Sequence, residues 1–320
     1  MKILVLGPNK PFLGAQIVQL PFLSGLRARW EEARITLALP FSGPTLFEEI
    51  RFHDVLDQGW AGSPARTLRL MLRSAVSGID AVYSLRARST RTGLVALASG
   101  ARRRFGFETA GGRLFYRPSV PPRERVYLAL KYLDLLGGGP AEAPPPVSLW
   151  SPEIAFEITA QFVERGISTP CLGILLGAGG EPKRWPTGRF LAVARQVRAE
   201  FPAVTVLYFL SPGEAGGAIG RALDGVERRF VFALRDLRAL ACALSRCAAL
   251  LSTDCGPAHF GHLLGMPQCV LFDGRGRPHE WFLPRPGARM LQAPASSDVS
   301  GIGVPEVVES LREILAGAVP

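Results

Sequence analysis

The chain has 320 residues, long enough for two domains, and its 48% hydrophobic and 20% charged residues are typical of a globular protein. Its most apolar stretch, 239–251, is too short to span a bilayer, and the apolar segment at 3–6 is too short for a secretion signal, so we expect a cytoplasmic protein. The net charge of +10 is uneven: residues 1–150 carry 20 Lys and Arg against 11 Asp and Glu, whereas 151–320 carry 17 against 16.

The first half alternates between predicted strands and predicted helices. Strands are expected at 2–6, 35–39, 80–85 and 103–107. Helices are expected at 15–30, 65–76, 92–99, 123–136 and 152–165, although Pro21 interrupts the first of them. A proline-rich spacer at 140–146 precedes the last helix.

The alternation restarts in the second half. Strands are expected at 171–176, 204–210, 248–251 and 269–272, and helices at 188–200, 214–223, 236–247, 258–264 and 304–316. Such alternation predicts an α/β protein with mostly parallel sheets covered on both faces. We therefore expect two Rossmann-like domains, 1–166 and 170–300, a closing helix within 301–320, and a cleft between the domains. Ligands of such sheets bind at the carboxyl ends of the strands.

All five cysteines lie in the second half, and no two of them form a C-x-x-C pair. They are Cys171, Cys242, Cys247, Cys255 and Cys269. Because most of them have apolar neighbours, we interpret them as reduced core residues and not as disulfides or zinc ligands.

Three loops follow predicted strands of the second half and carry polar side chains. The loop 177–186 combines glycines, which let backbone approach an anion, with Lys183 and Arg184. The loop 211–214 contributes Glu214, and the turn 253–259 opens a helix whose first amides are available to a phosphate. Together they suit a nucleotide diphosphate. The alternative is a set of ordinary capped turns, with Glu214 as a helix-stabilising first-turn carboxylate and His259 as a surface residue.

Several segments resemble glycosyltransferase family 9, the lipopolysaccharide heptosyltransferases that use ADP-heptose. In the second half these are GAGGEPKRWPTGRF (177–190), PGE (212–214) and STDCGPAHFGHLLGMPQCVLF (252–272). In the first half they are LGAQIVQLPFLSGLRARWEEARITLALP (13–40) and RRRFGFE (102–108). The resemblance implies a GT-B fold with the acceptor in the first domain and the nucleotide sugar in the second. It also implies inversion at the anomeric carbon, with no metal and no cofactor.

The resemblance also assigns site residues. Lys183 matches the lysine at the donor phosphates and is the candidate catalytic residue. Glu214 matches the acidic position at the ribose. The remaining donor-binding candidates are Gly177, Ala178, Gly179, Asp254, Cys255, Gly256 and His259. The loop 273–279 follows the last main strand and could close over the donor.

The first loop departs from the family pattern. Family members carry Gly-Asp there, and the aspartate is the expected general base, whereas this chain has Gly14-Ala15. Losing a positioned base costs roughly 10²–10⁴-fold in rate. Three alternatives stay open: another group such as Glu181 serves, the acceptor hydroxyl needs little assistance, or the chain binds nucleotide or glycan without turnover.

The basic first half suggests an anionic partner. The resemblance favours a phosphorylated or carboxylated glycolipid at the inner membrane surface, contacted by Arg66, Arg69 and Arg73 and by the cluster at 102–104. Solvated surface arginines are the alternative. A nucleic-acid-binding module is a weaker hypothesis, because the chain lacks a recognised aromatic-basic motif. His53 is expected at the surface, and His262 is expected to pack or cap rather than bind a metal.

Overall fold

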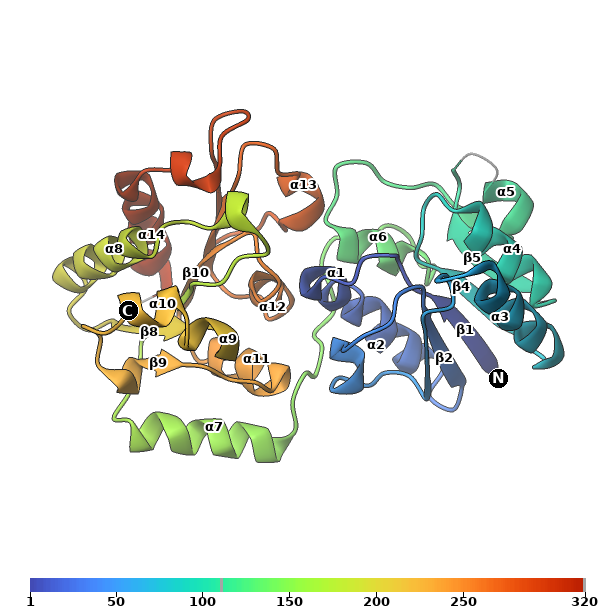
Figure 1. Cartoon of the computed structure of the whole chain (residues 1–320), viewed down its shortest axis with the longest axis horizontal. Helices are drawn as coiled ribbons and strands as arrows, with labels where there is room; N and C mark the ends of the chain where they lie inside the picture. The colour runs from blue at the N-terminus through green and yellow to red at the C-terminus, as the bar shows by residue number, and fades with distance from the viewer. Residues whose placement is uncertain (110–111, 319–320) are drawn as a thin grey trace. The chain divides into compact units, whose positions relative to one another are not determined.

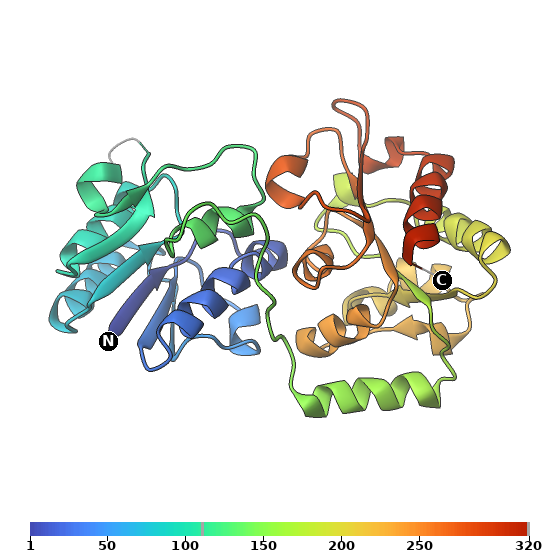
Figure 2. The ribbon, with the colours of Figure 1, turned by 180° about the vertical axis from the view of Figure 1, so that it is seen from behind.

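The computed structural model describes residues 1–109 and 112–318, and the chain divides into two compact units, Met1–Val147 and Ser148–Pro320 (Figures 1 and 2). The first domain expected from the sequence, 1–166, extends further along the chain than the first unit, which ends at Val147. The difference is α7 (Pro152–Glu164), which packs on α11 (Leu237–Ser245) through a hydrogen bond from Arg246 to Thr159 and therefore belongs to the second unit. Within the described residues, no helix combines the length and the apolar character needed to cross a membrane.

The first unit contains a six-stranded parallel sheet in the order β3-β2-β1-β4-β5-β6. The strands are β1 (Lys2–Leu6), β2 (Arg34–Leu39), β3 (Val55–Gln58), β4 (Ala81–Ser84), β5 (Arg103–Phe107) and β6 (Ser119–Val120). The chain starts near the middle and winds outward first one way and then the other, which is the doubly wound arrangement expected from the sequence.

Helices cover both faces of this sheet (Figure 1). They are α1 (Leu13–Ile17), α2 (Leu20–Arg29), α3 (Pro64–Val76), α4 (Thr90–Ala98), α5 (Gly112–Phe115) and α6 (Leu128–Asp134). The single helix predicted at 15–30 is wrong: it is two helices, and Pro21 lies in the first turn of the second, where its missing N–H costs nothing. The helix predicted from 123 begins only at Leu128, because Arg125 has a φ of 52° and Arg123 instead binds Asp134 with two nitrogens.

The second unit repeats the design with a parallel sheet in the order β12-β11-β10-β7-β8-β9. The strands are β7 (Cys171–Leu175), β8 (Thr205–Phe209), β9 (Val231–Phe232), β10 (Ala249–Thr253), β11 (Gln268–Phe272) and β12 (Ala288–Gln292). β7 and β10 are adjacent at the centre, and β8 and β11 flank them, so the loops that follow these four strands share one edge of the sheet.

The remaining helices of this unit are α8 (Thr187–Glu200), α9 (Pro212–Ala215), α10 (Ala218–Ala222), α12 (Ala258–Leu263), α13 (Pro278–Trp281) and α14 (Val304–Ala318). The helix predicted at 214–223 is divided at Gly216 and Gly217. α8 and α14 pack together over one face of the sheet, and their core includes the buried residues Phe190 and Leu311. This packing holds the strand ends, and so the loops beyond them, in place.

Candidate functional site

The loop after β7 is tied to its own unit by a buried tryptophan. Trp185 is 1% exposed, donates from Nε1 to the Ile302 carbonyl at 3.1 Å, and packs edge-on against Phe190 with ring centroids 4.8 Å apart. A short 3₁₀ turn, Glu181–Lys183, precedes it. The anchored tryptophan limits where Lys183 can lie, so the lysine projects from a positioned loop.

Lys183 forms an ion pair with Asp254, the residue that follows β10. The Asp254 side chain is 9% exposed, whereas the Lys183 side chain is 37% exposed. Burial raises the pKa of the Asp254 carboxyl, and the nearby Lys183 ammonium opposes that rise. The Asp254 backbone also donates to the Leu271 carbonyl at 2.8 Å. The structure therefore brings two predicted site residues, 71 positions apart, into direct contact.

Glu214 is held by the start of its own helix. Its carboxylate accepts hydrogen bonds from the backbone and side chain of Ser211 at 3.0 and 2.8 Å, completing a capping box. A Cβ at Gly177 would lie 3.0 Å from this carboxylate, so the loop after β7 passes directly beside Glu214. These contacts agree with the capping alternative, and the ribose role of Glu214 stays a prediction.

Beyond Asp254, the turn carries two buried side chains that are uncharged, Cys255 and His259. Burial raises the pKa of the Cys255 thiol to about 12 and lowers that of His259 to about 3, so at pH 7 neither side chain is charged. The alternative of a surface His259 is wrong, since this residue is 2% exposed. Gly256 accepts from the His259 amide at 3.1 Å. α12 spans only six residues, so its dipole attracts a phosphate less strongly than the sequence analysis expected of a helix beginning at this turn.

A pocket of about 380 Å³ opens beside the Lys183–Asp254 pair. Its wall combines the loop after β7 (177–186) with the loop after β11, and every lining residue belongs to the second unit. The lining residues are Gly179, Gly180, Pro182, Lys183, Asp254, Asp273, Arg275, Gly276, Arg277 and Trp281. The Trp281 ring lies 5.5 Å from the His259 ring, centroid to centroid, which joins α13 to α12 at this pocket.

The pocket gathers only some of the predicted residues. Gly179, Lys183 and Asp254 line it, whereas Gly177 lies beside Glu214, and Ala178, Cys255, Gly256 and His259 are outside its lining. The loop 273–279, expected to close over the donor, supplies Arg275 and Arg277 to the lining, whereas the sequence left Trp281 without a role. The signal that could have found Trp281 was its place shortly after the same loop, which follows β11 at the edge that β10 also meets.

The other histidines and the cysteines have structural surroundings. His262 Nδ1 lies 2.6 Å from Gln268 Nε2, and the ring packs edge-on against Phe282, in keeping with the predicted packing role. His53 is half-buried and packs against Phe47. All five cysteines are buried and unpaired. In the part of the chain that the structure describes, no group of three His, Cys, Asp or Glu side chains could hold a metal ion.

The buried histidines predict an acid-sensitive fold. Burial lowers the pKa of both His259 and His262, whereas both titrate near pH 6.5 in the unfolded chain. Between about pH 7 and pH 5.5 only the unfolded chain takes up these protons, so the free energy of unfolding should fall by about 2.5 kcal/mol as pH falls. Urea unfolding at both pH values measures this, and His259→Gln should remove about half of the difference. Equal stability at both pH values would contradict the assignment of two buried neutral histidines.

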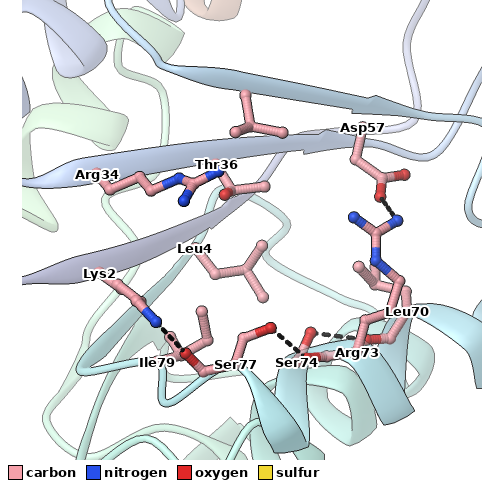
Figure 3. Close-up of a pocket in the computed structure, with 11 residues that line it drawn as sticks. Lys2, Leu4, Arg34, Thr36, Asp57, Leu70, Arg73, Ser74, Ser77 and Ile79 are labelled. Atoms are coloured by element: carbon pink, nitrogen blue, oxygen red, sulfur yellow. Dashed lines mark hydrogen bonds and ion pairs between the residues drawn. The ribbon is translucent and has the colours of Figure 1, made fainter.

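The first unit contains a different kind of pocket, at the amino ends of its strands (Figure 3). Two of the three cations that line it are already engaged: Lys2 donates to the Ser77 carbonyl at 2.8 Å, and Arg73 pairs with Asp57 at 2.9 Å. Since ligands of parallel sheets bind at the opposite, carboxyl edge, we do not assign it as the site. At that opposite edge, Gly14 and Ala15 lie in α1, and Ala15 is 2% exposed.

Comparisons with known proteins identify a family model and several solved structures that are similar to this chain. Residues 89–286 match the model of glycosyltransferase family 9 (heptosyltransferase). Among curated proteins no match is found. The fold resembles a family 9 glycosyl transferase from Veillonella parvula (20% identity, 99% of this chain and 97% of that chain, TM-score 0.73). It also resembles E. coli ADP-heptose LPS heptosyltransferase II (21%, 99% of both chains, 0.69) and E. coli heptosyltransferase WaaC with ADP (16%, 99% of both chains, 0.67).

The family model covers more than half of the chain, and the two parallel sheets with their flanking helices match the GT-B architecture of these heptosyltransferases. The fold expected from the sequence is thereby confirmed, and the chain belongs to glycosyltransferase family 9, the heptosyltransferase family.

Proposed function

We infer that this protein transfers a sugar, most simply a heptose, from ADP-heptose or a similar nucleotide sugar to an anionic lipopolysaccharide-type acceptor. The observation that carries this proposal is the pocket of the second unit, where Lys183, Arg275 and Arg277 surround a space of about 380 Å³. Three cations around one cavity suit the diphosphate of a nucleotide sugar, because charge-assisted hydrogen bonds to phosphate are the strongest that side chains make.

The second unit is proposed as the donor domain. The E. coli relative WaaC is described with ADP and with ADP-2-deoxy-2-fluoro heptose, which supports an adenine nucleotide as the donor class here. Lys183 is proposed to contact the donor phosphates, and Asp254 to hold the lysine ammonium at the pocket. Gly177, Ala178, Gly179, Glu214, Cys255, Gly256 and His259 remain proposed donor-binding residues, with the loop amides and the Glu214 carboxylate as the groups that would bind.

The first unit is proposed as the acceptor domain, acting at the inner face of the membrane. It carries 20 Lys and Arg against 11 Asp and Glu, whereas the second unit is nearly balanced. A phosphorylated or carboxylated saccharide would be attracted to such a surface.

The proposed reaction is a direct, inverting displacement at the anomeric carbon without a metal. The acceptor hydroxyl gives its proton to a base, with Glu181 as the first candidate, its oxygen bonds to the anomeric carbon, and the nucleoside diphosphate leaves with the electron pair of the broken bond. Lys183 would stabilise the negative charge that develops on the departing diphosphate. Holding the donor and the acceptor together in the reactive geometry would by itself supply part of the rate acceleration.

The second candidate is a family member that binds donor or glycan without turnover. One observation favours it: the position of the expected general base is the buried methyl group of Ala15. A transfer assay with ADP-heptose and truncated lipopolysaccharide separates the two candidates, since product formation eliminates the non-catalytic one.

Calorimetry tests what both candidates share. Titration of ADP and of ADP-heptose into the protein should give saturable binding of each. If neither of these, nor any other nucleotide diphosphate or nucleotide sugar, binds, the donor pocket is wrongly assigned.

A further inference from the structure

The outer side of α7, in the second unit, carries exposed apolar side chains in a line. Phe156 (76% exposed), Ala160 and Val163 (75% exposed) are three or four residues apart and therefore lie along one side of the helix. We call this line the α7 stripe. Other residues, among them the buried Ile158 and Phe162, hold α7 to its unit. α7 lies at the periphery of that unit (Figures 1 and 2), so the stripe is available to a partner.

A row of carboxylates borders the α7 stripe. Glu153, Glu157 and Glu164 lie together along one flank of it, because an α-helix turns by about 100° per residue. All three are exposed, and none of them forms an ion pair with a residue that the structure describes. Their negative charge is therefore free to attract a positively charged surface.

α3, in the first unit, has the same design with the opposite charge. Leu68 (55% exposed), Leu72 (59%) and Val76 (86%) are four residues apart and form the α3 stripe. Arg69 and Arg73 lie along one flank of this stripe. Arg73 pairs with Asp57, whereas the exposed Arg69 has no carboxylate within ion-pair distance among the described residues. α3 and α7 each span 13 residues, about 20 Å, so the two stripes also match in length.

The charged flanks determine how the two helices fit together. Going around each helix in the direction of the chain, the charges follow the stripe on the same side in α3 and in α7. Two such helices, stripe against stripe, bring their charged flanks together only when they run antiparallel. With the stripes centred on each other, Arg69 comes nearest to Glu164, and Arg73 comes nearest to Glu157. The antiparallel orientation also sets the positive end of each helix dipole beside the negative end of the other.

The same charges disfavour a symmetric contact. Two copies of α3 would set arginine against arginine, and two copies of α7 would set glutamate against glutamate. One stripe against the other gives an apolar centre with a row of opposite charges at its rim, which is the usual composition of an interface.

We propose that α3 of one copy of the chain packs antiparallel on α7 of a second copy, so that the protein associates head to tail. A contact of this kind leaves one α3 stripe and one α7 stripe unoccupied in a dimer, so further copies can add. This inference goes beyond sugar transfer and holds whether or not the protein turns over a donor.

The test is sedimentation velocity of the full chain without any nucleotide. As the concentration is raised into the range of a few hundred micromolar, the average sedimentation coefficient should pass the value of a dimer, since a small contact is weak and growth does not stop at two copies. The α3 variant, Leu68→Ser with Leu72→Ser, should associate at least about tenfold more weakly. The α7 variant, Phe156→Ser with Val163→Ser, should be weakened to a similar degree.

Mixing the two variants distinguishes a head-to-tail contact from a symmetric one. Each variant keeps one intact stripe, so an equimolar mixture should form a dimer and nothing larger, although each variant alone stays monomeric. Leu114→Ser is the matched control, because Leu114 is 72% exposed on α5 of the same first unit. It should leave association within about twofold of the wild-type chain. All substituted side chains are exposed, and circular dichroism confirms that each variant is folded.

A charge exchange tests the orientation. Arg69→Glu should weaken association about threefold to tenfold, and adding Glu164→Arg to the same chain should restore it to within about twofold of the wild-type chain. The antiparallel contact is overturned if the exchange does not restore association. The whole proposal is overturned if the wild-type chain stays monomeric, if either serine variant alone associates as the wild-type chain does, or if their mixture forms no dimer.

Discussion

Replacing Ala15 by aspartate is expected to raise the rate of sugar transfer by about 10²–10⁴-fold, the usual contribution of a positioned general base. The family pattern places a carboxylate at this position in the first loop, and this chain has a methyl group there that is 2% exposed. A carboxylate at such a buried position would have a raised pKa, which brings the base closer to neutral pH and strengthens it. The measurement is the initial rate of transfer from ADP-heptose to truncated lipopolysaccharide.

The matched control is Ala15→Asn, which has nearly the same size and polarity as aspartate and cannot accept the proton. It should leave the rate within about threefold of the wild-type chain. If a folded Ala15→Asp variant is no faster than Ala15→Asn, position 15 is not the site of a lost base. The proton acceptor then has to be sought elsewhere, with Glu181 as the first candidate.

Replacing Lys183 by alanine is expected to weaken ADP binding by about 10- to 100-fold, which corresponds to the loss of one hydrogen bond between charged groups. Its ammonium is held at the pocket by Asp254 and remains partly accessible there. Calorimetry with ADP measures the effect. Arg184→Ala is the matched control: this cation is the next residue, but it points to Glu181 and Glu214 and does not line the pocket. Its loss should change the affinity by no more than about threefold.

Lys183→Ala also leaves Asp254 as a buried carboxylate without its partner, so the variant should be less stable by about 1–3 kcal/mol, less than for a fully buried pair because the lysine is 37% exposed. The double variant Lys183→Ala with Asp254→Asn removes the unpaired charge. It should recover stability while ADP affinity stays low. If affinity recovers together with stability, Lys183 supports the fold and does not bind phosphate.

The sequence located the central strands well and missed the edges of both sheets. β3 and β6 are the edge strands of the first sheet, and β9 and β12 are those of the second, and none of the four was predicted. A central parallel strand is buried on both faces and reads as an apolar run, as in β10. An edge strand is short or half-exposed, as the pattern of β12 with Arg289 and Met290 at the surface shows, so it lacks that signal.

The predicted ends of helices were wrong where local backbone geometry overrides the helical spacing of apolar residues. The predicted helices at 15–30 and 214–223 have helical spacing, yet Pro21 forces a new helix start and Gly216 with Gly217 ends another. Apolar spacing reports which face is buried, and both helices of such a broken pair can bury the same face. Apolar spacing therefore did not reveal the breaks, although Pro21 marked the first of them in the sequence.

The candidate site was predictable in outline because it follows from topology. Loops after neighbouring parallel strands share one edge, which is why Lys183 and Asp254 meet although 71 positions separate them. Whether Arg275, Arg277 and Trp281 line the pocket depends on how the loop after β11 folds back toward the loop after β7. That path is set by contacts such as the bond from the Arg275 amide to the Asp273 carboxylate at 2.8 Å, which no sequence spacing specifies.

The donor pocket can be tested directly by a crystal structure of the protein with bound ADP. We expect the diphosphate to lie in the pocket of the second unit, with a phosphate oxygen about 3 Å from Lys183 Nζ and at least one of Arg275 and Arg277 in contact with it. ADP bound elsewhere, or a pocket that stays empty at a saturating concentration of ADP, would show that this pocket does not bind the donor.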